Sequence, residues 1–472
     1  MVKPDVFVTA KQLPFPAHHV PYGHKLSDEF IQSLQDQDYQ VETDEDVVQR
    51  VLKDNLEAAK EAHGDMGQKS QYRAIFHRAN KRFQTEDSKV AALNIASSGV
   101  IEEFPRAGFL AAQGGRQTME DRHKAARFTF VSGEKNVHAS LVGVFDGHTN
   151  SLAAEHVEMA IIDVLSENLA RYNPVKLSPA GIRTALRTTM VDLDRQISSG
   201  GTTACVAVAI EDVLWFVNVG DSRAVLLNRN GDYSALTLDI GGESMLNFSS
   251  MTQEVCNKGR MSGVSNCSRK FTDIFPLDQY PDILSEHGKK VIERGGEIIL
   301  YSFQYRSRKI NNIPPEGLAL PVWMNYAFNL YVSNPLSDDP LARRIGMPYA
   351  LGDHNLGGAV VSESQVTALE CKNLKDIDDL WLVIGCDGLF DCVHTQEYAK
   401  LLQSELADNS DVEGLTLAQK AATLAIERGS TDNISVLVLP VKSMFGSEVR
   451  SVSQVEQAAQ HDTGVKGVAA EL

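Results

Sequence analysis

The chain has 472 residues, of which 43% are hydrophobic and 23% are charged, a balance typical of a soluble globular protein that buries one large core or two moderate ones. Its formal net charge of −17 argues against binding to nucleic acids or to anionic lipid surfaces, because such proteins usually present a basic face. No run approaches about 18 consecutive apolar residues, and the N-terminus lacks an apolar core followed by a cleavage site, so we expect neither a membrane span nor a secretory signal.

Residues 1 to about 105 differ in character from the rest of the chain. Acidic, Gln-rich and basic stretches alternate here, and apolar residues such as Val47, Val51 and Leu52 recur at helical spacing. Helices with one apolar stripe usually pack on a neighbouring domain. We therefore expect a helical N-terminal extension over 1–105, through which a protein partner could bind.

From residue 106 to 442 the pattern changes to short apolar runs separated by turn residues, with longer amphipathic segments between them. This alternation indicates an α+β domain. One amphipathic helix is predicted after a Ser151 cap, and the apolar face of a second runs from Ile182 to Ile197. The candidate strands are 139–145, 204–210, 213–219, 223–227, 380–386 and 434–439.

Two stretches interrupt this domain, and one follows it. Residues 240–280 are rich in Ser, Asn, Gly, Met and Cys, and residues 318–346 carry several prolines. Loops of this length are usually functional flaps or disordered insertions. Residues 443–472 are polar and show no packing pattern, so we expect this tail to be disordered.

The six cysteines have no CxxC spacing, and several lie inside apolar runs. They are typical of reduced, buried thiols in an intracellular protein of the cytoplasm, the nucleus or both. Cys386 stands next to an aspartate but has no partnered histidine or basic neighbour in the sequence. We expect it to be inert.

Acidic residues stand at the ends of three candidate strands. Asp146 follows 139–145, Asp387 follows 380–386, and Asp432 precedes 434–439. Taken singly, each is a common type of turn residue. Carboxylates beside apolar strands are costly to bury unpaired, however, and several together favour a cation. With no His/Cys cluster nearby, an all-oxygen site suits Mg²⁺ or Mn²⁺, which can activate a bound water.

Seven short motifs, taken in order, resemble the type 2C family of metal-dependent protein phosphatases. Each is weak alone, but together they extend over roughly residues 106 to 440. The resemblance implies a β-sandwich of two antiparallel sheets flanked by α-helices. The motifs are Gly115–His123, Val144–His148, Gly201–Ala204, Asn218–Ala224, Ala350–Asp353, Cys386–Asp391 and Gly429–Ile434.

The resemblance also implies a site for two metal ions. Asp146 would bridge the ions and the Gly147 carbonyl would bind one of them. Asp387 and Asp432 would supply the carboxylates of the other. Around these ligands, Glu120 and Asp121 would hold metal-bound waters, and Asp221 would help to bind a third ion. Asn433 would add a hydrogen bond, and His123 would organise water.

The chemistry implied by the resemblance is hydrolysis of phosphoserine and phosphothreonine in proteins by a metal-activated water. Arg116 would grip the phosphate, because its planar guanidinium can hold two phosphoryl oxygens at once. His148 would act as the general acid for the departing serine or threonine oxygen. Phosphoproteins would then be the substrates.

The chain departs from the family pattern around this site. Thr149 and Asn150 stand where the family usually has two glycines, and Met347-Pro-Tyr replaces the usual residues before Ala350. An alternative function is therefore a weak or inactive phosphatase-like scaffold that binds a partner through the N-terminal helices or the insertions. Such a protein would be expected to have lost at least one of the three aspartates, and all are present.

Overall fold

The computed structural model describes residues 93–237, 239–247, 269–302, 328–333, 344–371, 377–393, 395–408, 411–428 and 430–445. The helices predicted for the N-terminal extension fall on residues 1–92, outside this part of the chain. Most of the predicted tail also falls outside it. Residues 443–445 belong to the short helix η7 (Val441–Phe445).

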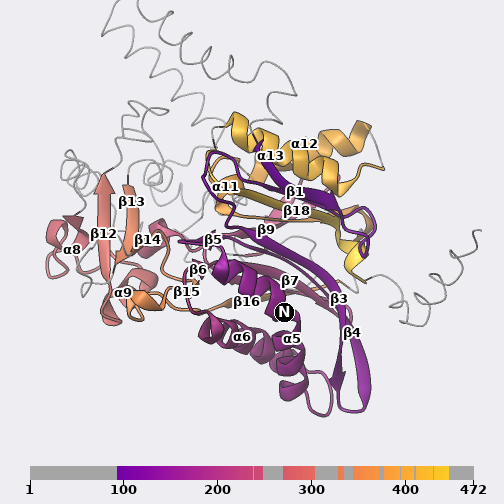
Figure 1. Ribbon diagram of the computed structural model, residues 1–472, viewed down its shortest axis with the longest axis horizontal. Coiled ribbons are helices and arrows are strands. Elements are labelled where there is room, and N and C mark those ends of the chain that lie inside the picture. Colours follow the sequence, from indigo (N-terminus) through magenta and orange to yellow (C-terminus); the bar gives the residue numbers. More distant parts are fainter. Residues whose placement is uncertain are drawn as a thin grey trace, which may run out of the picture.

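Two antiparallel sheets form the centre of the molecule (Figure 1). The six-stranded sheet contains, in spatial order, Ile95–Val100 (β1), Gly108–Ala112 (β2), Ile434–Pro440 (β18), Leu380–Gly385 (β17), Arg223–Asn228 (β9) and Tyr233–Ala235 (β10). The five-stranded sheet contains Gln365–Glu370 (β16), Val213–Val219 (β8), Ala204–Ile210 (β7), Lys135–Phe145 (β4) and Arg122–Ser132 (β3).

The central strands are apolar along their whole length because both faces of each sheet are covered. In β17, Leu382 and Ile384 pack into the core between the two sheets. Their neighbours Trp381 and Val383 pack on the opposite face, against helices. Since side chains alternate between faces along a strand, a strand buried on both faces must be a continuous apolar run. The predicted strand runs have this character.

Two pairs of helices cover the outer faces of the sandwich (Figure 1). Helices α5 (Leu152–Tyr172) and α6 (Pro179–Gln196) pack on the five-stranded sheet. Helices α12 (Thr395–Asp408) and α13 (Gly414–Glu427) pack on the six-stranded sheet. The predicted α+β fold, with two antiparallel sheets flanked by helices, is confirmed.

The N-termini of α5 and α6 differ. The Ser178 hydroxyl accepts a hydrogen bond from the Gly181 amide at 3.0 Å and so caps α6. Ser151 precedes α5 as predicted, but its side chain makes no capping bond. Its hydroxyl instead donates to Glu155 Oε1 at 2.9 Å. The predicted cap therefore marks the start of the helix without supplying the usual cap bond.

Strand β1 and a third sheet were not expected. The domain boundary predicted at residue 105 falls between β1 and β2, which pair with each other. A four-stranded sheet lies beside the sandwich, next to helices α8 (Phe271–Ile274) and α9 (Glu286–Glu293). It occupies parts of both stretches predicted as loops, and its strands are Arg269–Lys270 (β11), Glu297–Ser302 (β12), Phe328–Ser333 (β13) and Arg344–Ile345 (β14).

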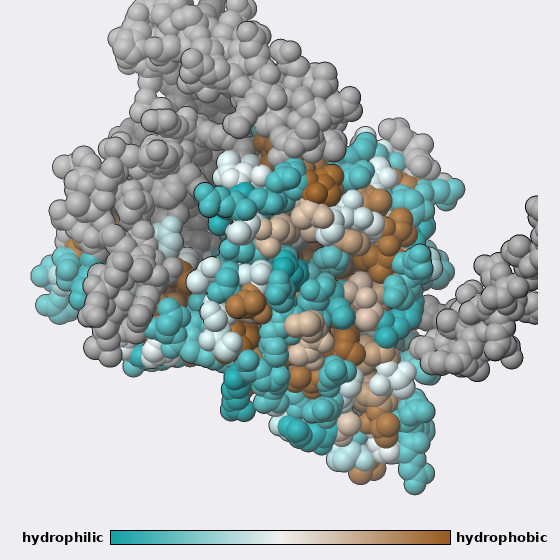
Figure 2. Space-filling view, in the orientation of Figure 1, coloured by the Kyte–Doolittle hydropathy of each residue, from teal (hydrophilic) through white to brown (hydrophobic). Residues whose placement is uncertain are grey.

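The surface seen in Figure 2 mixes hydrophilic and hydrophobic side chains, with the hydrophobic ones scattered among the others. Large exposed apolar residues on the described part include Met159 and Val175, with 70% and 79% of their surface accessible. Such scattered residues are normal on a protein surface. Among the described helices, none combines the length and apolarity needed to cross a membrane.

Candidate active site

Asp146 directly follows β4, and two threonines hold its backbone. Its amide donates to Thr203 Oγ1 at 3.0 Å. Its carbonyl accepts from the Thr203 amide at 2.9 Å and from Thr202 Oγ1 at 3.0 Å. The two threonine hydroxyls therefore form hydrogen bonds with the Asp146 backbone. They fix the position from which the Asp146 side chain leaves the sheet.

Asp387 and Asp432 meet because β17 and β18 run antiparallel. Gly385 at the end of β17 lies opposite Val436 near the start of β18, so the residue after one strand and the residue before the other reach the same edge. The segment after β17 passes very close to the segment before β18. A β-carbon at Gly388 would lie 1.8 Å from the Asn433 carbonyl oxygen, a position that only glycine can occupy.

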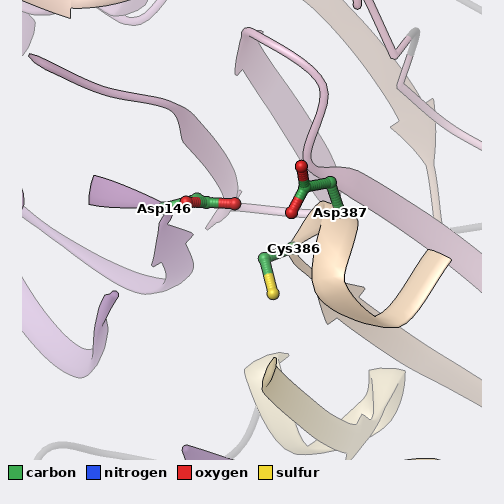
Figure 3. A group of neighbouring side chains, drawn as sticks. All are labelled: Asp146, Cys386 and Asp387. Carbon is green, nitrogen blue, oxygen red and sulfur yellow. The ribbon is translucent and has the colours of Figure 1, made fainter. Parts of the chain in front are cut away.

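The carboxylates of Asp146 and Asp387 face each other across the ends of the two sheets (Figure 3). Ligand atoms of Asp146, Asp387 and Cys386 all lie within 4.8 Å of one another. The Cys386 side chain points away from the two carboxylates in Figure 3. Its thiol donates to the Asn433 carbonyl at 3.4 Å and accepts from the Ser435 amide at 3.1 Å.

The Cys386 thiol is not a reactive group. Burial, followed by the nearby Asp121, Asp146 and Asp387, raises its pKa well above the ordinary value. A thiol that stays protonated is neither a good nucleophile nor a metal ligand. The structure thus agrees with the predicted inert role and leaves oxygen atoms as the donors of this site.

The carboxylates here carry more negative charge than the protein compensates. Burial raises the pKa of Asp146 well above its usual range, and Asp121 and Asp387 add to the effect. The pKa of Asp387 is raised to about 7 by burial and by neighbouring acids, among them Asp391 and Asp432. Ionised together in a dry environment, these groups repel one another unless a cation enters.

Asp121 shows most directly that the negative charge of these carboxylates is not compensated. Its side chain is buried, and neither carboxylate oxygen has a partner at hydrogen-bond distance within the described residues. Burial raises its pKa to about 7, although the nearby Ser435 hydroxyl and Cys386 thiol oppose the shift. A buried carboxylate whose nearby donors do not offset its burial favours a further partner, such as a cation.

Arg116 is the basic residue beside this cluster. Its guanidinium forms an ion pair with Asp432, and 56% of its side chain is exposed. Burial acts to lower its pKa, but Asp432, Asp387 and Asp146 outweigh that effect, so the pKa is raised. The predicted phosphate-gripping arginine therefore lies at the rim of the carboxylate cluster, with access to solvent.

Asn433 ties the Arg116 loop to the start of β18. Its side-chain oxygen accepts from the Glu120 amide at 2.9 Å. Its side-chain nitrogen donates to the carbonyls of Gln113 and Thr118, each at 2.9 Å. The Glu120 side chain accepts from Thr118 Oγ1 at 2.8 Å. The predicted helper residue thus holds the loop that carries Arg116, Glu120 and Asp121.

His148 lies one residue beyond Gly147, in β5 (Gly147–His148). Its Nε2 lies 2.5 Å from Asp353 Oδ2. A β-carbon at Gly147 would lie 2.4 Å from the Glu120 carbonyl, so glycine permits the close passage of these two segments. The structure therefore places the backbones of Gly147 and Glu120 side by side.

The next residue, Thr149, has a φ of +74°. This left-handed backbone is rare and strained for a β-branched residue, and glycine adopts it freely. Thr149 also lines a cavity of about 210 Å³, together with the segments Ile197–Gly200 and Asp353–Asn355. The departure from the family pattern thus puts strain and a side chain at the edge of the site.

The remaining predicted residues are only partly brought together. Asp221, in the turn after β8, is near enough to raise the pKa of Asp146. His123 packs its ring on Phe109, with centroids 3.9 Å apart. Burial, then Arg122 and Lys124, lowers its pKa to about 4. These contacts describe a neutral packed histidine, and they do not support the predicted role in organising water.

Two neighbours of the site were missed from the sequence. Asp391 raises the pKa of Asp387, and Asp353 contacts His148. Both are the final residues of motifs recognised above, so the signal was present in the sequence. What it did not indicate was the partner of each aspartate.

Comparisons with known proteins identify the family. A family model described as "Protein phosphatase 2C" matches residues 106–287 and 341–434, more than half of the chain. A rice "Protein kinase and PP2C-like domain-containing protein" is 24% identical over 350 residues, covering 72% of this chain and 40% of the relative. The bovine "Protein phosphatase 1L" is 32% identical over 136 residues, covering 27% of this chain and 37% of the relative.

The chain thus spans about two fifths of the length of these two relatives. Solved structures similar to it include "Structure of a C.elegans sex determining protein", with a TM-score of 0.45, 17% identity and coverage of 79% of this chain and 73% of that chain. Another is a serine-threonine phosphatase 2C from Toxoplasma gondii, with a TM-score of 0.43, 14% identity and coverage of 72% and 98%. Because the family model matches more than half of the chain, the chain belongs to the protein phosphatase 2C family.

Proposed function

We propose that this chain is a metal-dependent protein phosphatase that hydrolyses phosphoserine and phosphothreonine in phosphoproteins. The observation that carries the proposal is the buried carboxylate cluster of Asp121, Asp146 and Asp387, whose charge the protein does not balance. An exposed arginine stands at its rim. A cation-binding, phosphate-binding site accounts for both features.

The residues fit a pair of Mg²⁺ or Mn²⁺ ions, because the available donors are oxygens and the Asp121 oxygens lack partners among the described residues. Asp146 and the Gly147 carbonyl would hold one ion, and Asp146, Asp387 and Asp432 the other. Glu120 and Asp121 would orient bound waters, and Asp221 would assist a third ion. Such ions lower the pKa of a bound water and neutralise charge on the phosphate.

The side chains of the protein have distinct tasks in this scheme. Arg116 would hold the phosphoryl oxygens, since its guanidinium is permanently charged and reaches solvent. His148 would give a proton to the departing serine or threonine oxygen. Asn433 and Thr203 would keep the loop and the Asp146 backbone in place through the hydrogen bonds described above.

The alternative of an inactive scaffold is not favoured. Asp146, Asp387 and Asp432 are all present, and their neighbourhood is costly to keep without a function. A binding role for the N-terminal extension stays a prediction, since those helices fall outside the described residues. An intracellular location also stays a prediction.

The test is turnover of p-nitrophenyl phosphate and of a phosphothreonine peptide with and without Mn²⁺ or Mg²⁺. We expect metal-dependent turnover by the unaltered chain and its loss in Asp146→Asn. Asp163→Asn, at an exposed position on α5, is the matched control and should keep full activity. Arg116→Lys should raise KM for both substrates. Turnover that persists in Asp146→Asn would contradict the proposal.

A further inference from the structure

We infer that Asp353 is the positioning residue for His148, holding the imidazole by its Nε2 in a fixed orientation beside the carboxylate cluster. This inference rests on the proposed function. It assigns a role to Asp353, which lies outside the carboxylate cluster and has no predicted role in the sequence motifs.

A small three-stranded ribbon brings the two side chains together. Its strands are β5, β6 (Gly201–Thr202) and β15 (Leu351–Gly352), with β6 in the middle. His148 lies opposite Gly201 on one side, and Gly352 lies opposite Gly201 on the other. Asp353 follows Gly352 directly. The ribbon therefore positions His148 and Asp353 on either side of one glycine.

The absence of a side chain at Gly201 allows the contact. A β-carbon there would lie 2.1 Å from Asp353 Oδ2 and 2.2 Å from His148 Nε2. Any larger residue would occupy the space in which the carboxylate and the ring now meet. These two atoms lie within hydrogen-bond distance of each other, at 2.5 Å.

The backbone of Asp353 is held in an uncommon conformation. Its φ is +52°, in the left-handed region. The Asp353 amide donates to the Gly200 carbonyl at 2.9 Å, which anchors the turn to the ribbon. Strained backbone of this kind persists only where surrounding contacts impose it, and it is most common at functional sites.

The burial of the pair determines where the ring proton lies. The Asp353 side chain is 4% exposed and that of His148 is 21% exposed. A carboxylate in such a place needs a donor, and Nε2 is the one it contacts, so Nε2 carries a hydrogen. The His148 Nδ1 is buried and has no hydrogen-bond partner among the described residues.

The main test is Asp353→Asn, because asparagine has the same shape and tolerates positive φ. p-Nitrophenyl phosphate has a leaving group that is stable as an anion, whereas a phosphothreonine peptide releases an alkoxide that needs a proton. We expect kcat for the peptide to fall about 10- to 100-fold, within the range of general acid catalysis. KM for the peptide and kcat for p-nitrophenyl phosphate should change less than about threefold.

A double substitution tests whether Asp353 acts through the histidine. In a His148→Gln background, Asp353→Asn should cause no further loss of peptide turnover, because the two residues act as one unit. Additive losses would overturn the inference. The matched control is Asp194→Asn, which makes the same chemical change beside the same turn, where Asp194 accepts from the Gly352 amide at 2.7 Å. Its effects on the two substrates should be equal.

A spectroscopic measurement gives a readout that does not depend on activity. In metal-free protein with ¹⁵N-labelled histidine, the His148 ring should carry its proton on Nε2, and that signal should change in Asp353→Asn. A neutral His148 ring that carries its single proton on Nδ1 in the unaltered chain would overturn the inference. Equal losses for both substrates in Asp353→Asn would do so too and would leave the proposed function standing. No metal-dependent turnover by the unaltered chain would contradict the proposed function and this inference with it.

Discussion

Two regions of the molecule bury aspartates, and they do so in opposite ways. Asp239 lies against Arg223, whose Nε donates to Asp239 Oδ2 at 2.7 Å. The same guanidinium donates to Thr395 Oγ1 at 3.0 Å and lies 4.6 Å from the centroid of the Phe390 ring. At the ends of β4 and β17, by contrast, Asp146 and Asp387 face each other.

The difference separates structure from function. Burial raises the pKa of Asp239, but Arg223 opposes the shift, so this carboxylate has its cation within the fold. Burial and neighbouring acids both raise the pKa of Asp146, so that carboxylate depends on a cation from outside. We therefore expect the Arg223 and Asp239 pair to matter for stability and the aspartate cluster to matter for activity.

The largest effect should be on activity, at the cluster. Asp387→Asn should lower metal-dependent kcat by on the order of a thousandfold, because losing an ion costs several kcal/mol of charge stabilisation. The metal-free variant should be no less stable than the unaltered chain, since one repelling charge is gone. Steady-state kinetics and urea unfolding measure the two effects. A variant that is unfolded, or one that is fully active, would contradict this comparison.

The next effect should be on stability, at the ion pair. Arg223→Met leaves Asp239 buried without its cation and should cost about 3–5 kcal/mol of unfolding free energy. Urea unfolding of the metal-free protein measures this cost. Adding Asp239→Asn should recover part of it, because the uncompensated charge is removed. If Arg223→Met changed stability by less than about 1 kcal/mol, the pair could not have the structural role described here.

A third buried group, His123, stays neutral instead of pairing, and it predicts a pH dependence. Burial lowers its pKa from 6.5 to about 4. The unfolded chain therefore binds a proton more readily than the folded chain between these values. The contribution of His123 is fully present above about pH 6.5 and is lost as the pH falls toward 4, at on the order of 1 kcal/mol per pH unit.

His123→Phe should remove the contribution of His123 to the pH dependence of the unfolding free energy while keeping an aromatic ring against Phe109. The measurement is the difference in unfolding free energy between variant and unaltered chain from pH 7 to 4.5, in metal-free buffer. The variant should gain in relative stability as the pH falls. Parallel curves would mean that His123 is not held neutral.

The smallest effect concerns the strained residue beside the site. Thr149→Gly should raise the unfolding free energy by about 1 kcal/mol or less, because relief of the left-handed backbone is partly offset by the flexibility of glycine in the unfolded chain. Thermal unfolding is sensitive enough to detect it. Loss of stability in this variant would show that the Thr149 side chain makes contacts that outweigh the strain.

The sandwich was largely predictable from the sequence because its central strands are unbroken apolar runs. Strands β7 and β8 lie at Ala204–Ile210 and Val213–Val219, as predicted. Glu211, between them, has a φ of +50°, which suits a tight turn. In the four-stranded sheet, which was missed, the edge strands β11 and β14 have two residues each and are too short to show a period. The inner strands β12 and β13 have six residues each and were overlooked.

Some residues of the candidate site were predictable from the sequence and others were not. Asp146 and Asp387 could be brought together from the sequence, since each directly follows an apolar strand and strand ends share an edge of the sandwich. Asp353 could not be assigned a partner, because its contact with His148 depends on the two-residue strands β5, β6 and β15. Such short pairings leave no pattern in the sequence and are set by the fold as a whole.

The central claim is that the aspartate cluster is a cation site, and thermal unfolding with and without Mn²⁺ tests it most directly. For the unaltered chain, Mn²⁺ at 100 times its dissociation constant should add about 2.7 kcal/mol to the stability. Asp146→Asn should start from an equal or higher melting temperature without metal and respond much less to Mn²⁺. An unaltered chain that does not respond to Mn²⁺ or Mg²⁺, or an Asp146→Asn variant that responds equally, would contradict the account.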